Sequence, residues 1–342
     1  MNEQISIEKI DAKRLEGFKA PYVKCIQAGN KTEFICLAKS PKPFPVRKLN
    51  KDSYVRVDTG EVFEYKHIKN RSQSIQSVRK SITNLRRLIN TNCKDVEKVR
   101  FATLTYAENM TDSGRLYRDF KNFWGRFCYW CKKKNIAKPE YIAVAEPQGR
   151  GAWHMHVIII FKETAPFIDN AEEFAPLWGY GHTTIRKIKN CDNFEVYFCA
   201  EVTDMPLEDF QQSDIAHNGN IFEVKERGGS KEGTGGKTKK KFVKGARLYL
   251  YPPGMNLYRC SRGVLKPTVT KMSNSEYQKK KASAGTLTFV SACNIVSDNG
   301  DKSEIINTIS HEYYNKKPQK SQSKQTKKKI PSNVLDKMGL YY

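Results

Sequence analysis

The feature that most restricts the fold is the segment YIAVAEPQGRGAWHMHVIIIF, residues 141–161. Two apolar runs rich in β-branched and aromatic residues flank a short polar loop that contains Gly149 and Gly151. This pattern predicts a β-hairpin. Beyond His156 the second run is entirely apolar, so we expect this strand to be buried inside a sheet.

The flanking segments predict further strands and helices, and therefore a mixed α+β fold. Residues 98–108 are typical of a buried strand, and residues 176–189 of a turn followed by a short strand. Apolar residues at three- and four-residue intervals predict helices over 72–90 and 114–135. A third helix, of about three turns, is expected after Asp192 or Asn193, and Pro206 lies beyond its end.

We expect a basic N-terminal extension over residues 1–70, a central domain over 71–265, and a C-terminal extension over 266–342. The Gly- and Lys-rich segment 217–245 is expected to be a long loop. Its KEGTGGKT sequence has Lys231 where a phosphate-binding loop needs its first glycine, so no nucleotide cofactor is expected. Two strands are predicted around Pro252 and Pro253, and a Lys-rich, disordered tail from about residue 315.

The charge of the chain indicates a polyanionic partner. Its 342 residues carry a formal net charge of +24, which is typical of proteins that bind nucleic acid. No run approaches the roughly 18 apolar residues that a membrane helix needs, and no secretion signal is evident. We therefore expect a cytoplasmic protein with reduced thiols. Cys128 and Cys131 fit one turn of the predicted helix better than half a metal site.

The two histidines of WHMH are candidate metal ligands. Side chains at i and i+2 of a strand project to the same face, so His154 and His156 point together and Met155 points away. Pairing across the hairpin could bring Glu146 within reach of both imidazoles. Two imidazoles and one carboxylate suit a metal that polarises a phosphodiester. A pair of structural histidines is the simpler alternative.

The helix after Asp192 supplies a candidate nucleophile. Tyr197 and Glu201 are four residues apart and so share one helical face. A tyrosine hydroxyl beside a metal-activated phosphate can act as a nucleophile. Packing of Tyr197 in a core remains the alternative on the helix pattern alone.

Three blocks in this order resemble the three motifs of rolling-circle replication initiators of the HUH endonuclease superfamily. FATLTYAE (101–108) is similar to the first motif, RGAWHMHVIII (150–160) to the metal-binding second, and DNFEVYFCAEVTDM (192–205) to the tyrosine-bearing third. The resemblance covers residues 70–265 and is closest to initiators from plasmids, phages and integrative elements of low-GC bacteria. The second motif is the specific one.

The resemblance implies a ferredoxin-like HUH nuclease domain with a central antiparallel sheet, histidines on a middle strand, and helices on one face. It implies that His154, His156 and Glu146 hold Mg²⁺ or Mn²⁺. Tyr197 would attack one origin strand, remain linked to its 5′ phosphate and free a 3′ hydroxyl for a polymerase. A host helicase is the expected partner for unwinding.

This chain departs from many relatives at the third motif. Neither a second tyrosine nor a lysine follows Tyr197, since Ala200 and Glu201 occupy those positions. Glu201 is therefore predicted to act as a general base on water, which would end the cycle by hydrolysis. The nucleophile could instead be Tyr249, Tyr251 or Tyr258.

Several residues near the motifs are candidate DNA contacts, through phosphate pairing, base stacking or a place at the sheet edge. They are Thr103, Thr105, Tyr106, Arg150, Trp153 and Arg186. The alternatives to a replication nickase are a basic DNA-binding protein without chemistry and a related HUH relaxase or transposase.

Overall fold

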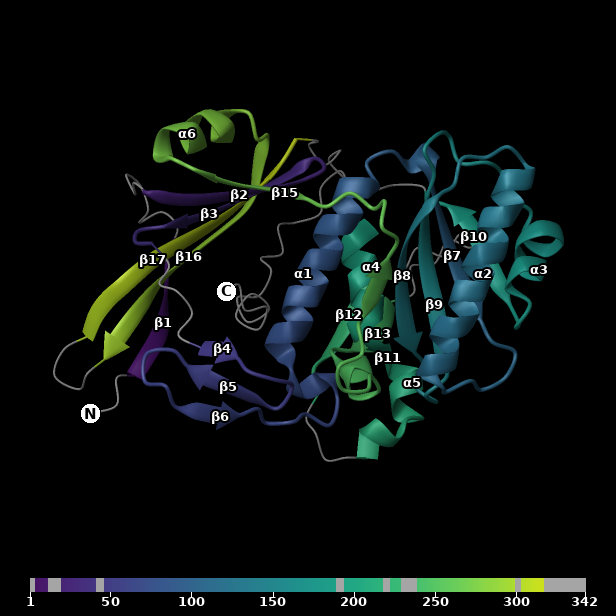
Figure 1. Ribbon diagram of the computed structural model, residues 1–342, viewed down its shortest axis with the longest axis horizontal. Coiled ribbons are helices and arrows are strands. Elements are labelled where there is room, and N and C mark those ends of the chain that lie inside the picture. Colours follow the sequence, from purple (N-terminus) through teal and green to yellow (C-terminus); the bar gives the residue numbers. More distant parts are fainter. Residues whose placement is uncertain are drawn as a thin grey trace. The chain divides into compact units, whose positions relative to one another are not determined.

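The computed structural model describes residues 4–11, 20–40, 46–188, 194–217, 222–228, 239–298 and 303–316. The chain divides into two compact units (Figure 1). Among the described residues, unit 1 comprises those up to 67 and from 266 onward, and unit 2 comprises those from 68 to 265. Within the described ranges, no helix combines the length and the apolar character that crossing a membrane requires.

Unit 2 is organised around a five-stranded antiparallel sheet in the order β10-β7-β9-β8-β14. The predicted hairpin is formed by β8 (Glu140–Pro147) and β9 (Trp153–Ile160), and β7 (Val99–Thr105) pairs with the other edge of β9. The outer strands are β10 (Thr183–Lys187) and β14 (Tyr258–Cys260). β9 is therefore the central strand, which explains its apolar sequence.

Helices cover both faces of this sheet. The aromatic helix α2 (Ser113–Lys133) packs on one face, where Phe120 contacts Tyr141 of β8 with ring centroids 5.0 Å apart. α4 (Phe194–Thr203) packs on the other face, where Phe198 lies 5.9 Å from Phe101 of β7. α1 (Ile75–Asn92) contacts α4, and the short α3 (Ala175–Trp178) contacts α2.

The α+β class is as expected, but the expectation of helices on one face differs from the structure. The reason is that the central strand β9 carries buried apolar residues on both sides, so both faces need a covering helix. Met155 on the α2 face and Val157, Ile158 and Ile159 along β9 are all at most 1% exposed.

The segment after α4 differs from its prediction. β11 (Met205–Pro206), β13 (Lys239–Val243) and β12 (Val224–Gly228) form a small sheet, and α5 (Leu207–Gln211) follows β11. β12 and β13 lie within the segment that was expected to be a loop. KEGTGGKT lies outside the described residues. The alternating ARLYLYP segment was expected to be a strand, and this is wrong. Gly245 (φ 69°) begins a 3-10 helix over Ala246–Tyr249 instead.

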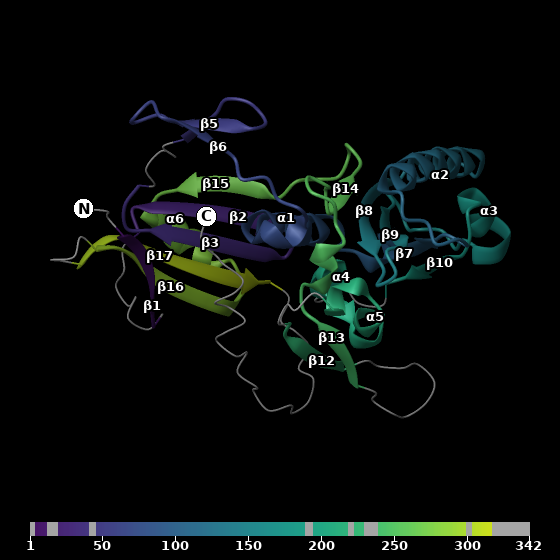
Figure 2. The same cartoon turned by 90° about the horizontal axis from the view of Figure 1, so that it is seen from below.

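In unit 1 the N-terminal and C-terminal segments share one antiparallel sheet (Figure 2). Its order is β1-β16-β17-β3-β2-β15, and α6 (Asn274–Ala282) contacts β2. The strands span Gln4–Ile10 (β1), Tyr22–Ala28 (β2), Lys31–Leu37 (β3), Thr268–Met272 (β15), Thr286–Asp298 (β16) and Ser303–Asn315 (β17). The two predicted extensions are thus parts of one folded unit, because β17 pairs with β3 and β16 with β1. The expected tail lies outside the described residues from 317 onward.

A second sheet of unit 1 is small and comes from the N-terminal segment alone. It consists of β4 (Val46–Lys48), β5 (Ser53–Arg56) and β6 (Val62–Glu64), which pair antiparallel in that order.

The stability of unit 2 depends on the aromatic core beneath α2. Phe123 is fully buried, and its ring lies within 6.0 Å of Phe127, Phe174 and Trp178. We expect Phe123→Ala to lower the free energy of unfolding by about 3–5 kcal/mol. Tyr129→Ala, on the same helix but 61% exposed, should change it by less than about 1 kcal/mol. Denaturant unfolding of both variants tests this, and equal effects would contradict the packing described.

Candidate active site

The sheet register brings the predicted metal ligands together on the face that α4 covers. Glu146 of β8 lies directly opposite His154 of β9. On the other edge of β9, Thr105 lies opposite His154 and Thr103 lies opposite His156. Directly opposed residues of antiparallel strands project to the same face. The two imidazoles, one carboxylate and two hydroxyls therefore form one polar group on an otherwise apolar sheet, which we call the histidine face.

His156 is held from both of its ring nitrogens. Nδ1 lies 3.2 Å from the Oγ1 of Thr103, and Nε2 contacts the Glu146 carboxylate. Only 12% of the His156 side chain and 11% of the Glu146 side chain is exposed. A neutral ring protonated at Nε2 would donate to Glu146 and accept from the Thr103 hydroxyl. The Thr103 contact at Nδ1 fixes the orientation of the ring, as the second contact of a metal-binding histidine does, and directs Nε2 toward Glu146.

Arg247 completes the group and was not foreseen from the sequence. It lies in the 3-10 helix, is 5% exposed, and forms an ion pair with the second oxygen of Glu146. Its remaining donors bind the main-chain carbonyls of Asp204 (2.7 Å) and Pro147. A buried arginine is stable only with such partners. The sequence did contain a signal, because Arg247 lies inside an apolar segment. The prediction of a strand there gave no reason for an arginine at that position.

His154 differs from His156 because its Nε2 atom is buried and has no hydrogen-bond partner among the described residues. Burial lowers the pKa of His154 to about 4, although Glu146 opposes the shift. The ring is therefore neutral near pH 7 and has an unshared electron pair. This is the protonation state that a metal ligand requires.

Glu146 is ionised despite its burial. Burial alone would raise the pKa of this carboxyl, but the contacts with His156 and Arg247 outweigh it and lower the pKa below its usual value. The donor types on the histidine face therefore fit a divalent cation, and the unpartnered Nε2 of His154 supports that fit. As arranged, Glu146 engages His156 and Arg247, and the described ranges contain no ready-made cluster of three or more His, Cys, Asp or Glu ligands.

α4 packs directly over the histidine face. Phe198 is 2% exposed and lies 6.5 Å from the His156 ring, and both Phe194 and Phe198 contact Phe101. Tyr197 and Glu201 belong to this helix. Their side chains, and the expected N-cap residues Asp192 and Asn193, lie outside what the structure describes. The backbone of the tyrosine-bearing helix is nevertheless adjacent to the two histidines.

Two of the expected DNA contacts are buried away from this group. Tyr106 is 4% exposed, and its hydroxyl donates to Asp119 over 3.0 Å. Trp153 is 3% exposed, and its indole nitrogen donates to the Thr111 carbonyl over 2.9 Å. Both side chains therefore have packing roles in the fold.

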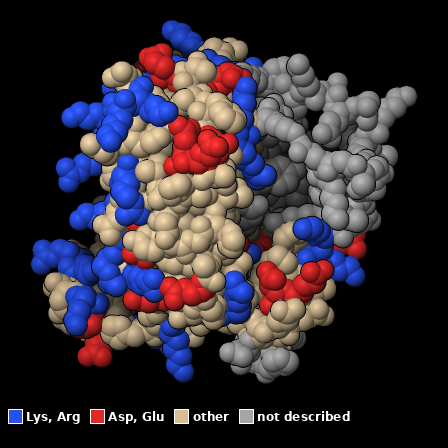
Figure 3. Space-filling model, turned by 90° about the vertical axis from the view of Figure 1, so that its right-hand side faces the viewer, with Lys and Arg blue, Asp and Glu red and all other residues tan. Residues whose placement is uncertain are grey.

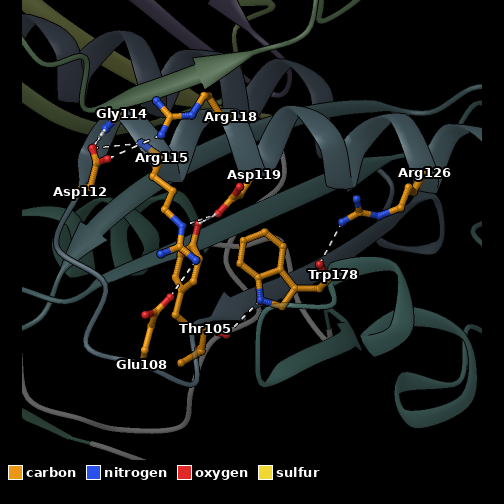
Figure 4. A network of polar contacts seen from close by, with 10 residues as sticks. Thr105, Glu108, Asp112, Gly114, Arg115, Arg118, Asp119, Arg126 and Trp178 are labelled. Carbon is orange, nitrogen blue, oxygen red and sulfur yellow. Dashed lines mark hydrogen bonds and ion pairs between the residues drawn. The ribbon is translucent and has the colours of Figure 1, made fainter.

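A polar network fixes the end of β7, where Thr105 enters the histidine face (Figure 4). Arg115 lies between Glu108 (2.8 Å) and Asp119 (3.4 Å), and Trp178 donates to the Thr105 carbonyl over 3.0 Å. Arg126 in turn donates to the Trp178 carbonyl over 3.0 Å. The first motif therefore owes its position to α2 and α3 as well as to the sheet.

The other expected DNA contacts lie closer to solvent. Arg150 is exposed in the hairpin loop and contributes to the lowered pKa of His154. Arg186 is exposed on β10, with its guanidinium 5.2 Å from the centre of the Phe101 ring. In the view of Figure 3, Lys and Arg side chains spread along one side of the surface with smaller groups of Asp and Glu among them. Such a surface is compatible with a phosphate backbone.

The alternative tyrosines differ in how accessible they are. Tyr251 is fully buried, its hydroxyl donates to the Ala145 carbonyl over 2.6 Å, and burial raises its pKa. The Tyr249 ring packs 5.4 Å from Phe222, and Tyr258 is half-buried on β14. Tyr251 in particular cannot reach a substrate without opening the core.

The segment of the chain that resembles known proteins is the segment that contains the histidine face. Residues 99–205 match a family model of replication-associated proteins, described as the ORF2 type. The matched segment begins with β7, ends at β11 and contains Glu146, His154, His156 and α4. Neither the curated proteins nor the solved structures contain a match to the chain. The central part of unit 2 is therefore similar to replication-associated proteins, which supports a role in replication.

The burial of His154 predicts a pH effect on stability. The unfolded chain protonates His154 below its ordinary pKa of 6.5, whereas the folded protein does so only near 4. The free energy of unfolding should therefore fall as the pH drops from 6.5 to 4, by roughly 1–3 kcal/mol from this residue. We expect His154→Gln to remove that part of the loss. Unfolding curves at pH 7 and pH 4.5 test this, and the same pH dependence in both proteins would refute it.

Proposed function

We propose that this protein is a rolling-circle replication initiator of the HUH type, which nicks one DNA strand at an origin through a tyrosine. The proposal is carried by one observation. Within the segment similar to replication-associated proteins, two histidines, a buried carboxylate and the tyrosine-bearing helix meet on one sheet face. The net charge of +24 is consistent with a DNA substrate.

In this proposal His154, His156 and Glu146 hold Mg²⁺ or Mn²⁺. Such an ion would polarise the scissile phosphate and neutralise charge that develops on its oxygens. Thr103 orients His156, and Arg247 keeps Glu146 ionised and in place. Arg150 and Arg186 are exposed cations available to the flanking phosphates.

Tyr197 is the proposed nucleophile. Its phenolic oxygen forms a bond to the scissile phosphorus, and the bond from that phosphorus to the 3′ oxygen breaks. The phenolic proton passes to solvent, and the departing 3′ oxygen takes one proton from solvent to become a hydroxyl, so protons balance over the step. The products are a 5′-phosphotyrosine and a free 3′ hydroxyl, so the energy of the phosphodiester is retained and the strand can be rejoined.

Glu201 is proposed to act in the closing step. As a carboxylate one helical turn after Tyr197, it would accept a proton from the water that hydrolyses the final phosphotyrosine. A host polymerase would extend the 3′ hydroxyl, and a host helicase would unwind the duplex.

Replacing the nucleophile tests the chemistry. Wild type and Tyr197→Phe are incubated with end-labelled single-stranded origin DNA and Mn²⁺, with or without a chelator, and the products are separated on denaturing gels. We expect a metal-dependent nick with label on the protein, and loss of both in Tyr197→Phe. An adduct that persists in the variant would move the nucleophile to Tyr249 or Tyr258. Binding without cutting in both proteins would favour a DNA-binding protein without chemistry.

Metal binding is tested separately from cutting. We expect His156→Ala to weaken Mn²⁺ binding by roughly tenfold or more, measured by titration calorimetry without DNA. His67→Ala is the matched control, since the His67 side chain is 73% exposed, belongs to unit 1 and should leave the affinity unchanged. Equal Mn²⁺ affinity in wild type and His156→Ala would refute the metal assignment.

A further inference from the structure

The small sheet β4-β5-β6 of unit 1 is unusually exposed for a folded element. None of its ten strand residues is buried, so this sheet does not enclose an apolar core of its own. It nevertheless carries large apolar side chains that remain accessible, among them Val62 (62% exposed) and Phe63 (37%). Accessible apolar groups concentrated on one small element indicate a binding surface.

Three aromatic rings gather on one side of this sheet. Tyr54 of β5 lies opposite Phe63 of β6, and their rings are stacked with centroids 5.5 Å apart and planes 18° apart. Tyr65, just after β6, is 38% exposed and lies 4.9 Å from the Tyr54 ring. The rings support one another in a continuous layer. We call Tyr54, Phe63 and Tyr65 the aromatic layer.

A cation accompanies the aromatic layer. Lys48 of β4 is opposite Tyr54, so a lysine, a tyrosine and a phenylalanine form one cross-strand row on the same face. Lys48 is exposed and forms no ion pair with a carboxylate in the described ranges. Lys66 follows Tyr65 and, by strand alternation, projects to the opposite face.

The nearby acids are engaged locally. Asp58 pairs with Arg56 over 2.7 Å, and Asp52 contacts His67 over 3.3 Å. Glu64 lies between Phe63 and Tyr65 in the sequence and so projects to the opposite face. The charge next to the aromatic rings is therefore positive.

We propose that the aromatic layer is a second nucleic-acid site, which binds single-stranded DNA by stacking of unpaired bases on Tyr54, Phe63 and Tyr65. Stacking on exposed aromatic rings with lysines at the backbone is the recurrent solution for single strands, and every base offers a face to stack. A duplex would not expose its bases to such a layer. The choice of single-stranded DNA rests on the proposed function, because nicking and displacement would generate that strand.

The proposal assigns a role to the N-terminal segment that the nuclease chemistry does not use. The histidine face belongs to unit 2, whereas the aromatic layer belongs to unit 1. Loss of the layer should therefore weaken DNA binding without removing the metal ligands or the nucleophile.

The test is a binding titration that does not depend on cutting. Full-length Tyr197→Phe is the parent, and fluorescence anisotropy follows a labelled single strand of mixed sequence, about 20 nucleotides long, which exceeds a typical single-strand site. We expect Phe63→Ala/Tyr65→Ala in this parent to weaken binding by roughly fivefold or more, from the loss of stacked bases. Tyr22→Ala, which removes a 45% exposed tyrosine from β2 of the same unit, is the control and should bind like the parent.

A crosslinking measurement guards against misfolding of the double variant. Unmodified protein is irradiated with an oligonucleotide that contains 5-iododeoxyuridine, and the crosslinked tryptic peptides are identified by mass spectrometry. We expect crosslinks in peptide 57–66, which contains Phe63 and Tyr65. Unchanged affinity in the double variant, or strand binding with crosslinks confined to unit 2, would overturn the proposal. A change in oligomeric state with unchanged affinity would assign the layer to a second copy of the chain instead.

These outcomes separate the two proposals. Failure of the aromatic layer leaves the nicking assay with wild-type protein unaffected. Conversely, a protein that binds single strands through the layer but never forms a DNA adduct would retain the second site and lose the proposed nuclease function.

Discussion

The buried carboxylate of Glu146 is the constraint on which the candidate site depends. A carboxylate that is 8% exposed in a sheet this apolar requires compensating charge and hydrogen bonds. His156 provides one contact and Arg247 the other. To reach Glu146, Arg247 is anchored by main-chain carbonyls at both Asp204 and Pro147. The polar group thus ties together the hairpin, the end of α4 and the 3-10 helix, and its geometry is set by folding.

The two faces of the central sheet differ in composition: one is apolar and the other carries a polar group. On the α2 side, Met155, Phe120 and Phe123 are buried and form a conventional core. On the α4 side, the same strands present the histidines, Glu146 and the two threonines, and α4 covers this group with Phe194 and Phe198. A reactive group built on central strands is held more rigidly than one built on loops. The polar network at Arg115 extends that rigidity to the end of β7.

The sequence predicted the elements of unit 2 well where their periodicity was strong. The hairpin, β7, α1, α2 and α4 follow directly from apolar spacing, and the i, i+2 rule placed the histidines on one face. The pairing of Glu146 with His154 followed from the hairpin loop. In contrast, the position of Arg247 depends on the 3-10 helix that follows Gly245. The alternating Leu and Tyr residues of this segment predicted a strand instead. Tyr106 and Trp153 were expected at the DNA because tyrosine and tryptophan suit both cores and bases, and only the tertiary structure distinguishes these roles.

The sheet of unit 1 could not be predicted from the sequence for a different reason. Its sheet pairs β1, β2 and β3 with strands more than 200 residues away, and no local pattern specifies such partners. The aromatic layer was also missed, since Tyr54, Phe63 and Tyr65 are spaced as ordinary strand residues. Their joint exposure becomes visible only when the rings are seen beside one another.

If the histidine face activates a tyrosine of α4, that tyrosine carries the DNA in a trapped adduct, and peptide mapping of the adduct tests this most directly. Wild-type protein is reacted with single-stranded origin DNA and Mn²⁺, digested with nuclease and trypsin, and analysed by mass spectrometry. We expect a nucleotide phosphate on peptide 190–225, in which Tyr197 is the only tyrosine. A phosphate on peptide 248–259, which carries Tyr249, Tyr251 and Tyr258, or the absence of any adduct while DNA and metal bind, would contradict it.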